Sequence, residues 1–405
     1  MTSVAILGAG ARGQAYAEYA LVRPNEMKII AVADMKDYIR DMMKEKYDVS
    51  DDMIFESYDD FFAKGLIADA IFIATQDDDH VEPAIKAMEI GYKHIMVEKP
   101  IDGDADKCLF LAKKAKEYGA TVQVCHSLRY TEFYRKLKEV LKSGVIGDIA
   151  SIIHLEGLGH FHYSHSFVRG DWCNSETSSP MILAKCCHDN DLLLYLLDKD
   201  CKMVSSYGSL MHFKPENAPE GSADRCIECK YSHSCPYSAT LYYDKQRDHF
   251  GRLAVEKEGY TDVGDALRSG RYGRCAYKCD NNVVDHQVVN YVFDGGVTAN
   301  LTMTGFSDIG RETRIFGTKG EIYAHMEGNI IKVTEFGSGN TTVYDICHDD
   351  TMHSGADTFL VREFMQVVRG EAEPISSIDV SVQSHVMCRA AERSRINNGE
   401  SIILK

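Results

Sequence analysis

The sequence predicts an α/β protein in which a doubly wound parallel sheet is followed by a large, mostly antiparallel sheet. Three observations carry this prediction. Apolar runs alternate with helical patterns over residues 4–124, a glycine-rich turn joins the first run to the first helix, and residues 285–336 alternate apolar and polar side chains between turn signals. Alternating strands and helices indicate parallel βαβ units, whereas alternation with short turns indicates antiparallel pairing.

Composition sets the class of protein before any motif is considered. The chain has 405 residues, 44% of them hydrophobic, so we expect about two domains with a substantial core. The formal net charge of −16 gives no electrostatic support for nucleic-acid binding. The sequence has no basic leader and no long apolar run, and its 13 cysteines follow no disulfide framework. These features favour a cytoplasmic protein without membrane contact.

The first strand and helix enclose a glycine motif. Val4–Leu7 is apolar and enters Gly8-Ala9-Gly10-Ala11-Arg12-Gly13, after which a helical pattern begins. A G-x-G-x-x-G turn between a strand and a helix is typical of dinucleotide binding, because the glycines let a pyrophosphate approach the backbone. The predicted cofactor contacts of this turn are Gly8, Ala9, Gly10, Arg12 and Gly13.

A second strand, Lys28–Val32, leads to Asp34 at the distance expected for a carboxylate that binds the adenosine ribose. A carboxylate at this place repels a 2′-phosphate. NAD is therefore favoured over NADP as the cofactor.

The alternation continues through residues 67–75, 81–90, 94–97, 104–118 and 121–124, read as strand, helix, strand, helix and strand. Thr75 ends the first of these strands, and His80 precedes the helix after it. Both are candidate cofactor contacts, and His80 is equally consistent with a residue that caps the helix.

Val97-Glu98-Lys99-Pro100 ends the strand at 94–97. Ligands bind outside the carboxyl ends of the strands in an open parallel sheet, and proline stops the strand because it has no N–H to donate. Glu98 and Lys99 are thus expected at the cofactor site, and Lys99 is expected to reach a substrate.

An unusual stretch, residues 159–172, follows a predicted helix at 130–143 and a strand at 149–158. It combines hydrogen-bond donors with an aromatic face, a combination that suits a sugar. A metal site and a plain surface loop are the alternatives. The candidate substrate contacts here are His160, His162, His165, Arg169 and Trp172.

An insertion at about 212–280 contains a C-x-x-C pair with further cysteines nearby. Thiolates at this spacing can supply part of a tetrahedral zinc site, and iron–sulfur ligation or free thiols are the other interpretations. The candidate ligands of a structural zinc ion are Cys226, Cys229, Cys235 and Cys275.

The sequence resembles the Gfo/Idh/MocA family of NAD(P)-dependent oxidoreductases, which includes glucose–fructose and inositol dehydrogenases. The likeness rests on the glycine turn, on Glu98-Lys99-Pro100 and on several later motifs; these are Leu128-Arg129-Tyr130, Gly144–Asp148, His188–Asp191 and Phe316–Gly320. It implies an NAD-binding Rossmann domain, here residues 1–124, and an α+β substrate domain, here 125–405. It also implies a homodimer or homotetramer that assembles through the open sheet of the second domain.

The resemblance also implies that Lys99 lies beside the nicotinamide and that His188 assists it. In this family an aspartate usually stands four residues before that histidine, and here the position is Ala184, followed by Lys185. Lys99 and His188 remain as the acid/base pair. His188, Lys185 and Arg129 join the substrate contacts.

Three functions are compatible with these residues. The first is an NAD-dependent dehydrogenase that moves a hydride between nicotinamide and a hydroxyl of a sugar, polyol or sugar derivative. The second is an NAD-dependent glycosidase that works by transient oxidation and elimination. The third is a non-catalytic NAD-binding sensor, which the missing carboxylate at Ala184 would fit.

Overall fold

The computed structural model describes residues 1–245, 250–251, 254–255, 259–346 and 355–404. The chain folds into two compact units, each built from segments that are not contiguous in the sequence. The first unit comprises Met1–Val145, Cys187–Asp200 and Tyr344–Arg389; the second comprises Ile146–Cys186, Cys201–Val343 and Ala390–Lys405. The division into two continuous domains after residue 124 stays a prediction.

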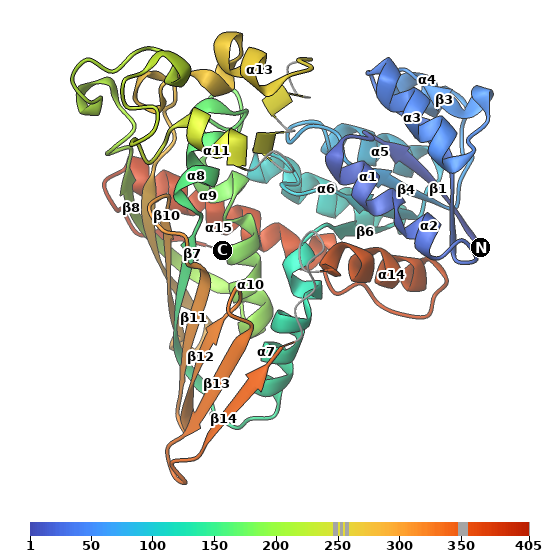
Figure 1. The fold of residues 1–405 in the computed structure, drawn as a ribbon. Coiled ribbons are helices and arrows are strands. Elements are labelled where there is room, and N and C mark those ends of the chain that lie inside the picture. The colour runs from blue at the N-terminus through green and yellow to red at the C-terminus, as the bar shows by residue number, and fades with distance from the viewer. Residues whose placement is uncertain (246–249, 252–253, 256–258, 347–354, 405) are drawn as a thin grey trace. The chain divides into compact units, whose positions relative to one another are not determined.

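The first unit contains a six-stranded sheet with the order β3-β2-β1-β4-β5-β6, in which every neighbouring pair is parallel (Figure 1). The strand order reverses between β1 and β4. Doubly wound sheets bind ligands at such a topological switch point. The predicted parallel sheet is confirmed. The strands are β1 Thr2–Leu7, β2 Met27–Ala33, β3 Ile54–Phe55, β4 Ala70–Ile73, β5 His94–Val97 and β6 Thr121–Val124.

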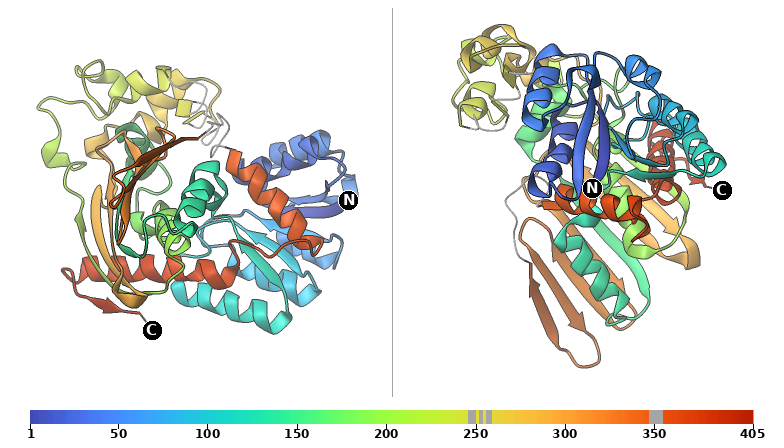
Figure 2. Two further views of the ribbon diagram at one scale, coloured as in Figure 1. Left: turned by 90° about the horizontal axis from the view of Figure 1, so that it is seen from below. Right: turned by 90° about the vertical axis from the view of Figure 1, so that its right-hand side faces the viewer.

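Helices cover both faces of this sheet, as both views of Figure 2 show. Successive side chains of a strand point to opposite faces, so Ile6 packs into one core cluster and Leu7 into the other. The first cluster is completed by α1 Ala11–Ala17, α2 Tyr19–Val22, α3 Asp37–Tyr47 and α14 Ala356–Val368. The second takes α4 Tyr58–Ala63, α5 Val81–Ile90, α6 Ala105–Tyr118 and the start of α15 Ile378–Ile396.

Local signals set the ends of several helices. Asp104 accepts a hydrogen bond from the backbone of Asp106 and begins α6, and Gly91 ends α5 with a φ of 118°, which residues with a Cβ rarely adopt. Thr131 caps α7, Glu132–Lys142, in the same way as Asp104. The first unit also contains α10, Cys187–Leu197.

The second unit is built on a nine-stranded sheet with the order β14-β13-β12-β11-β7-β10-β9-β8-β15. The pair β7–β10 is parallel, and the pairs β11–β7, β11–β12, β12–β13, β10–β9, β8–β9 and β15–β8 are antiparallel. The predicted large, mostly antiparallel sheet is thereby confirmed. Its strands are β7 Ile149–Gly157, β8 Cys201–Ser209, β9 His286–Phe293, β10 Thr298–Thr304, β11 Gly310–Gly317, β12 Gly320–His325, β13 Ile330–Glu335, β14 Thr341–Asp345 and β15 Ile402–Ile403.

Short helices lie against one end of this sheet in sequence regions that showed no clear period. Residues 159–172 form α8, His160–Tyr163, and a π-helical turn, Ser164–Arg169, and most of them are buried. The segment is buried through its aromatic side chains, because Phe161 and Phe167 pack inside and are each less than 5% exposed. The described part of the unit also contains the α-helices α9 Met181–Ala184, α11 Ala239–Lys245 and α13 Val263–Ser269.

Over the described part of the chain, none of the helices combines the length and the apolar character needed to cross a membrane.

Candidate cofactor and active site

The glycine turn between β1 and α1 has the close packing that its sequence predicts. Gly8 has a φ of 81°, and a Cβ there would lie 2.5 Å from the carbonyl oxygen of Ala74. A Cβ on Gly13 would lie 2.2 Å from the carbonyl oxygen of Gly8, so that helix and turn touch. Around Gly10, by contrast, a Cβ would meet no atom within 4 Å. The backbone at Gly10 is therefore open to a ligand, which fits a bound pyrophosphate.

Asp34 stands beside this turn, just past the end of β2. Its Oδ2 accepts a hydrogen bond from the backbone N–H of Ala9 at 2.9 Å, and its Oδ1 accepts one from Lys36 at 2.9 Å. The carboxylate thus fixes the turn while remaining partly exposed. This placement fits a carboxylate that meets the adenosine ribose of a dinucleotide.

Arg12 forms an ion-pair network inside the first unit. Its guanidinium donates to Glu98 Oε1 at 2.6 Å and to both carboxylate oxygens of Asp357 at 2.7 and 2.9 Å. Glu98 Oε2 in turn accepts the backbone N–H of Lys99. Burial alone would raise the pKa of Glu98, but the charges of Arg12 and Lys99 hold it below its usual value. Glu98 is therefore an anion that ties the glycine turn to the segment that carries Lys99.

Two histidines hold the backbone that follows Lys99. His80 Nδ1 lies 2.8 Å from the carbonyl oxygen of Pro100, and His385 Nε2 accepts the N–H of Ile101 at 2.8 Å. His80 Nε2 also lies 3.3 Å from the carbonyl oxygen of Thr75. His80 is 1% exposed, and these contacts link the ends of β4 and β5.

His188, on the first turn of α10, packs against a second imidazole. The ring centroids of His126 and His188 are 5.8 Å apart, and those of His126 and His385 are 5.9 Å apart. Burial, and then the charges of Arg129 and Lys99, lower the pKa of His126 well below its usual value. Burial raises the pKa of Cys187, next to His188, to about 12, and the charge of Lys99 opposes this rise. The rings of His126, His188 and His385 thus form one cluster, and His126 and His385 are members that the sequence did not reveal.

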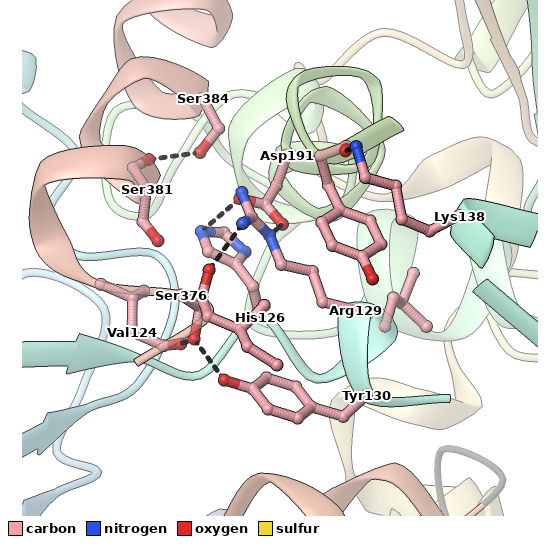
Figure 3. A network of polar contacts seen from close by, with 12 residues as sticks. Val124, His126, Arg129, Tyr130, Lys138, Asp191, Ser376, Ser381 and Ser384 are labelled. Carbon is pink, nitrogen blue, oxygen red and sulfur yellow. Dashed lines mark hydrogen bonds and ion pairs between the residues drawn. The ribbon is translucent and has the colours of Figure 1, made fainter. Parts of the chain in front are cut away.

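Arg129 is committed to a buried ion pair. It donates to both carboxylate oxygens of Asp191, at 2.6 and 2.7 Å (Figure 3). It also donates to the carbonyl of Ile375 at 2.8 Å. Only 2% of Arg129 is exposed. These contacts support a role in holding α10, and with it His188, against the strand ends.

The histidines of α8 and the turn after it have different surroundings in the second unit. His160 Nδ1 lies 2.8 Å from the carboxylate of Asp308, and His160 Nε2 contacts the hydroxyl of Tyr242. His165 is stacked on Tyr272 with 4.6 Å between ring centroids. His160 keeps 26% of its side chain exposed, whereas His165 is 3% exposed.

The other three side chains predicted to contact a substrate in this segment also differ. Arg169 is fully buried and donates to the carbonyl oxygens of Arg274 and Tyr237 at 2.8 and 2.7 Å. Trp172 lies with its ring 6.1 Å from Phe167 and is partly exposed, and His162 has its ring 5.4 Å from Phe250. The contacts of Arg169 support a structural role, while Trp172 and His162 stay open to a ligand in part.

Lys185 directly follows Ala184 and meets a buried carboxylate. Its Nζ lies 3.5 Å from Glu156 Oε1, and Arg311 binds the other oxygen of Glu156 at 2.9 Å. Glu156 points inward from β7 and is 2% exposed. Position 184 is an alanine, but a carboxylate from another element of the second unit, Glu156 of β7, lies next to Lys185.

The four cysteines predicted to bind zinc line one cavity, together with Tyr231, Tyr237 and Tyr277. Even so, no group of three or more His, Cys, Asp or Glu side chains is arranged to hold a metal ion anywhere in the part of the chain that the structure describes. The expectation of a structural zinc ion is corrected accordingly, and Cys226, Cys229, Cys235 and Cys275 are not joined by disulfide bonds.

Two protein-family models together match most of the chain. Residues 2–126 match the model described as "Oxidoreductase family, NAD-binding Rossmann fold". Residues 134–323 match the model described as "GFO/IDH/MocA C-terminal domain".

Curated relatives are distant and only partly aligned. The scyllo-inositol 2-dehydrogenase (NAD(+)) of Bacillus subtilis is 27% identical over 228 residues, 55% of this chain and 61% of its own length. The 2,7-anhydro-N-acetylneuraminate hydratase of Escherichia coli is 29% identical over 157 residues, 38% of this chain and 41% of its own length. The chain thus spans between two fifths and two thirds of the length of these relatives.

Solved structures share the whole fold at low sequence identity. An oxidoreductase from Agrobacterium radiobacter in complex with NAD+, L-tartaric acid and magnesium has a TM-score of 0.71 at 13% identity, covering 99% of this chain and 98% of its own. The scyllo-inositol dehydrogenase from Lactobacillus casei with NAD(H) and scyllo-inositol has a TM-score of 0.68 at 17% identity, covering 100% and 99%. With both of its parts matched by family models, this chain belongs to the Gfo/Idh/MocA family of NAD-binding oxidoreductases.

Proposed function

We propose that this protein transfers a hydride between NAD and a hydroxyl group of a sugar, polyol or sugar derivative, with Lys99 and His188 as the acid/base pair. The observation that carries the proposal is the anchoring of Lys99: Glu98 binds its backbone N–H, and His80 and His385 bind the two residues after it. A base must be held in place to take a proton from a hydroxyl as the hydride leaves. NAD, when bound, accepts or returns that hydride.

Asp34 supports NAD rather than NADP as the cofactor. Its carboxylate lies at the glycine turn and is already anchored there by the N–H of Ala9. A 2′-phosphate brought to the same place would be repelled by this charge. Cofactor preference in this proposal therefore depends on one residue.

The test of the proposal is turnover with a panel of sugars, polyols and sugar acids, followed by NADH absorbance and by product analysis. Lys99→Ala should lower turnover by about 10²- to 10⁴-fold, as expected for the loss of a general base, while NAD binding measured by calorimetry changes little. Lys113→Ala, at an exposed position of α6, is the matched control. Near-normal turnover of Lys99→Ala would contradict the assignment, and tight NAD binding without any turnover of the parent protein would favour the sensor.

A redox-neutral reaction is the second candidate, in which the hydride returns to the product. It is favoured by a relative named as a hydratase, because adding or removing water involves no net oxidation. A glycosidase that works by transient oxidation and elimination is the same kind of chemistry with a different leaving group. Both predict product formation from aryl glycosides or anhydro sugars without accumulation of NADH, and NADH formed in step with product would exclude them.

We also propose that copies of this chain associate through the nine-stranded sheet. Side chains alternate along its strands, and one face carries partly exposed apolar residues, among them Ile153 at 48%, Met203 at 37% and Tyr207 at 57% exposure. An exposed apolar sheet face marks an interface in many proteins. A homodimer or homotetramer would cover it.

A further inference from the structure

Four cysteines of the second unit line one cavity, and two of them form a C-x-x-C pair. Cys226 and Cys229 face this cavity together with Cys235 and Cys275, and none of the four is joined in a disulfide bond. Their side chains do not converge on one point as the ligands of a single metal ion do. The chemistry of this cavity is therefore that of thiols.

The backbone brings Cys226 and Cys229 to a spacing that suits a disulfide bond. Residues 226–228 form one 3-10 turn, and the N–H of Cys229 donates to the carbonyl oxygen of Cys226 at 3.2 Å. In such a turn, side chains three residues apart lie above one another, and a rise of about 2.0 Å per residue puts their Cα atoms about 6 Å apart. Disulfide bonds join cysteines whose Cα atoms are about 4.4–6.8 Å apart. The turn itself thus gives the pair a spacing at which a disulfide can close.

Positive charge lies near both members of the pair. Arg169, which is fully buried, donates a hydrogen bond from Nη2 to Cys226 Sγ at 3.6 Å. The hydrogen bond to Asp224 raises the pKa of Lys278, and negative charge at Cys229 contributes to this rise, so the ammonium group lies within electrostatic reach of that thiol. Positive charges beside a cysteine pair stabilise the negative charge that a sulfur carries when it attacks or leaves.

The two sulfurs of the pair differ in their access to solvent. Cys226 is 7% exposed, whereas Cys229 is partly exposed. A dissolved disulfide can therefore reach Cys229, while Cys226 is its buried partner on the same turn. This asymmetry is that of an attacking thiol and a resolving thiol.

The other two thiols of the cavity are less suited to attack. Burial raises the pKa of Cys235 and that of Cys275, and the thiolate rather than the thiol is the nucleophile. Neither of them belongs to a C-x-x-C pair. The choice among the four cysteines therefore falls on Cys226 and Cys229.

We infer that Cys226 and Cys229 are a redox-active dithiol, in which Cys229 attacks a small disulfide such as glutathione disulfide and Cys226 resolves the mixed disulfide. In the first step the Cys229 thiolate bonds to one sulfur of the small disulfide, whose S–S bond breaks and releases one thiolate. In the second step Cys226, having lost its proton to solvent, bonds to Cys229 Sγ and releases the second thiolate. The cysteine pair is oxidised by two electrons and the small disulfide is reduced to two thiols, which take up the two protons that the cysteines lose.

This reaction is separate from the proposed hydride transfer, because it uses no NAD and no residue of the proposed acid/base pair. It gives the second unit two covalent states, dithiol and disulfide. The thiol–disulfide balance around the protein sets their ratio.

The experiment treats the full-length protein with mixtures of reduced and oxidised glutathione, quenches it with acid, alkylates the remaining thiols and maps the peptides by mass spectrometry. We expect one disulfide, Cys226–Cys229, which grows with the share of oxidised glutathione and disappears with dithiothreitol. In a time course of the parent protein, a glutathionyl group should appear on Cys229 before the disulfide forms. Cys173→Ser, at a partly exposed position of the same unit that does not line the cavity, is the matched control and should leave the disulfide unchanged.

Two substitutions separate the roles of the pair. Cys226→Ser removes the resolving thiol, so the disulfide should be lost and the glutathionyl group should persist on Cys229. Cys229→Ser removes the attacking thiol, so both products should be lost. Circular dichroism checks that each variant is folded, and the time course of the parent protein tests the same order of events without a substitution.

A folded parent protein in which Cys226 and Cys229 both stay open to alkylation in oxidised glutathione would overturn the proposal. A disulfide between Cys235 and Cys275, formed in place of the expected one, would overturn it as well. Metal analysis of the purified protein gives an independent check, and we expect no stoichiometric zinc or iron. A metal retained by the parent protein and lost in Cys229→Ser would contradict the proposal, because ligated thiolates are withdrawn from exchange.

Discussion

Arg12 donates a hydrogen bond from Nε to Glu98 Oε1 at 2.6 Å, and this ion pair joins the glycine turn to the segment that carries Lys99. Arg12 was expected to contact the cofactor directly, and the structure shows it bound to two carboxylates, those of Glu98 and Asp357. Arg12 therefore supports both the glycine turn and the segment that carries Lys99. A change at Arg12 should therefore affect stability and cofactor binding together.

Arg12→Ala should lower the free energy of unfolding by about 3 kcal/mol, because it leaves Glu98, which is 4% exposed, without its main counter-charge. Urea denaturation measures this loss, and calorimetry should show weaker NAD binding. Lys86→Ala breaks an exposed pair with Asp59 and serves as the control, at less than about 1 kcal/mol. A loss for Arg12→Ala as small as that of the control would contradict a structural role for the network.

Asp34→Ser should shift the cofactor preference from NAD toward NADP. The serine keeps a hydroxyl but removes the negative charge, so a 2′-phosphate is no longer repelled. We expect NAD to bind about 10-fold more weakly, the loss of one hydrogen bond to a charged group, and NADP to bind more tightly. Calorimetry with both cofactors measures the ratio, and an unchanged ratio would show that Asp34 does not set it.

The elements around the cofactor turn could be predicted because their signals are local. The strand His94–Val97 is a short apolar run with a proline three residues after its end, and the helix Val81–Ile90 ends at Gly91, whose φ of 118° suits glycine. Each signal lies within a few residues of the boundary that it sets. Neither depends on where the rest of the chain goes.

The environment of the site residues could not be predicted, because it depends on contacts between distant segments. Arg12 and Asp357 are 345 residues apart in the sequence, and His160 and Tyr242 are 82 apart. No pattern in one sequence pairs them. For the same reason, the sequence could not show that Arg129 forms an ion pair with Asp191. Nor could it show that Arg169 donates its hydrogen bonds to backbone carbonyls.

The segment 159–172 illustrates a further limit of sequence patterns. Its polar residues favour an exposed loop, yet Ser164, His165, Ser166 and Arg169 are each at most 5% exposed. Their polar groups are satisfied inside, for example by the hydroxyl of Tyr243 at 2.7 Å from His165. A buried polar segment held by distant partners has no periodic signature, so the pattern indicates the wrong structure.

Stability should fall as the pH is lowered from about 6.5 toward 3, and His385 should contribute to this fall. Burial, and then the charge of His126, lower the pKa of His385 to about 3, whereas an unfolded histidine titrates near about 6.5. Between these values the unfolded state binds more protons than the folded state, so protonation favours unfolding. The carbonyl of Ser381 and the carboxylate of Asp191, which favour the charged form, and Lys99, which disfavours it, also act on His385.

His385→Gln should reduce the pH dependence of the unfolding free energy in this window, since glutamine can still accept the N–H of Ile101 but does not titrate. Urea denaturation at a series of pH values gives the slope for each protein. His233→Gln, at an exposed position, is the control and should leave the slope unchanged. Equal slopes in the parent protein and in His385→Gln would contradict the buried neutral state of this histidine.

Ile153→Asp should weaken self-association of the protein. Ile153 lies in the middle of β7, where it faces the exposed side of the sheet between Asn300 of β10 and Arg314 of β11. Burying a carboxylate in an interface between copies is costly, so the assembly should dissociate at concentrations where the parent protein stays associated. Light scattering coupled to size-exclusion chromatography measures the mass, with Leu109→Asp, an exposed apolar position of α6, as the control. A parent protein that is monomeric at every concentration, or an Ile153→Asp variant with the parent's mass, would show that copies do not meet through this face.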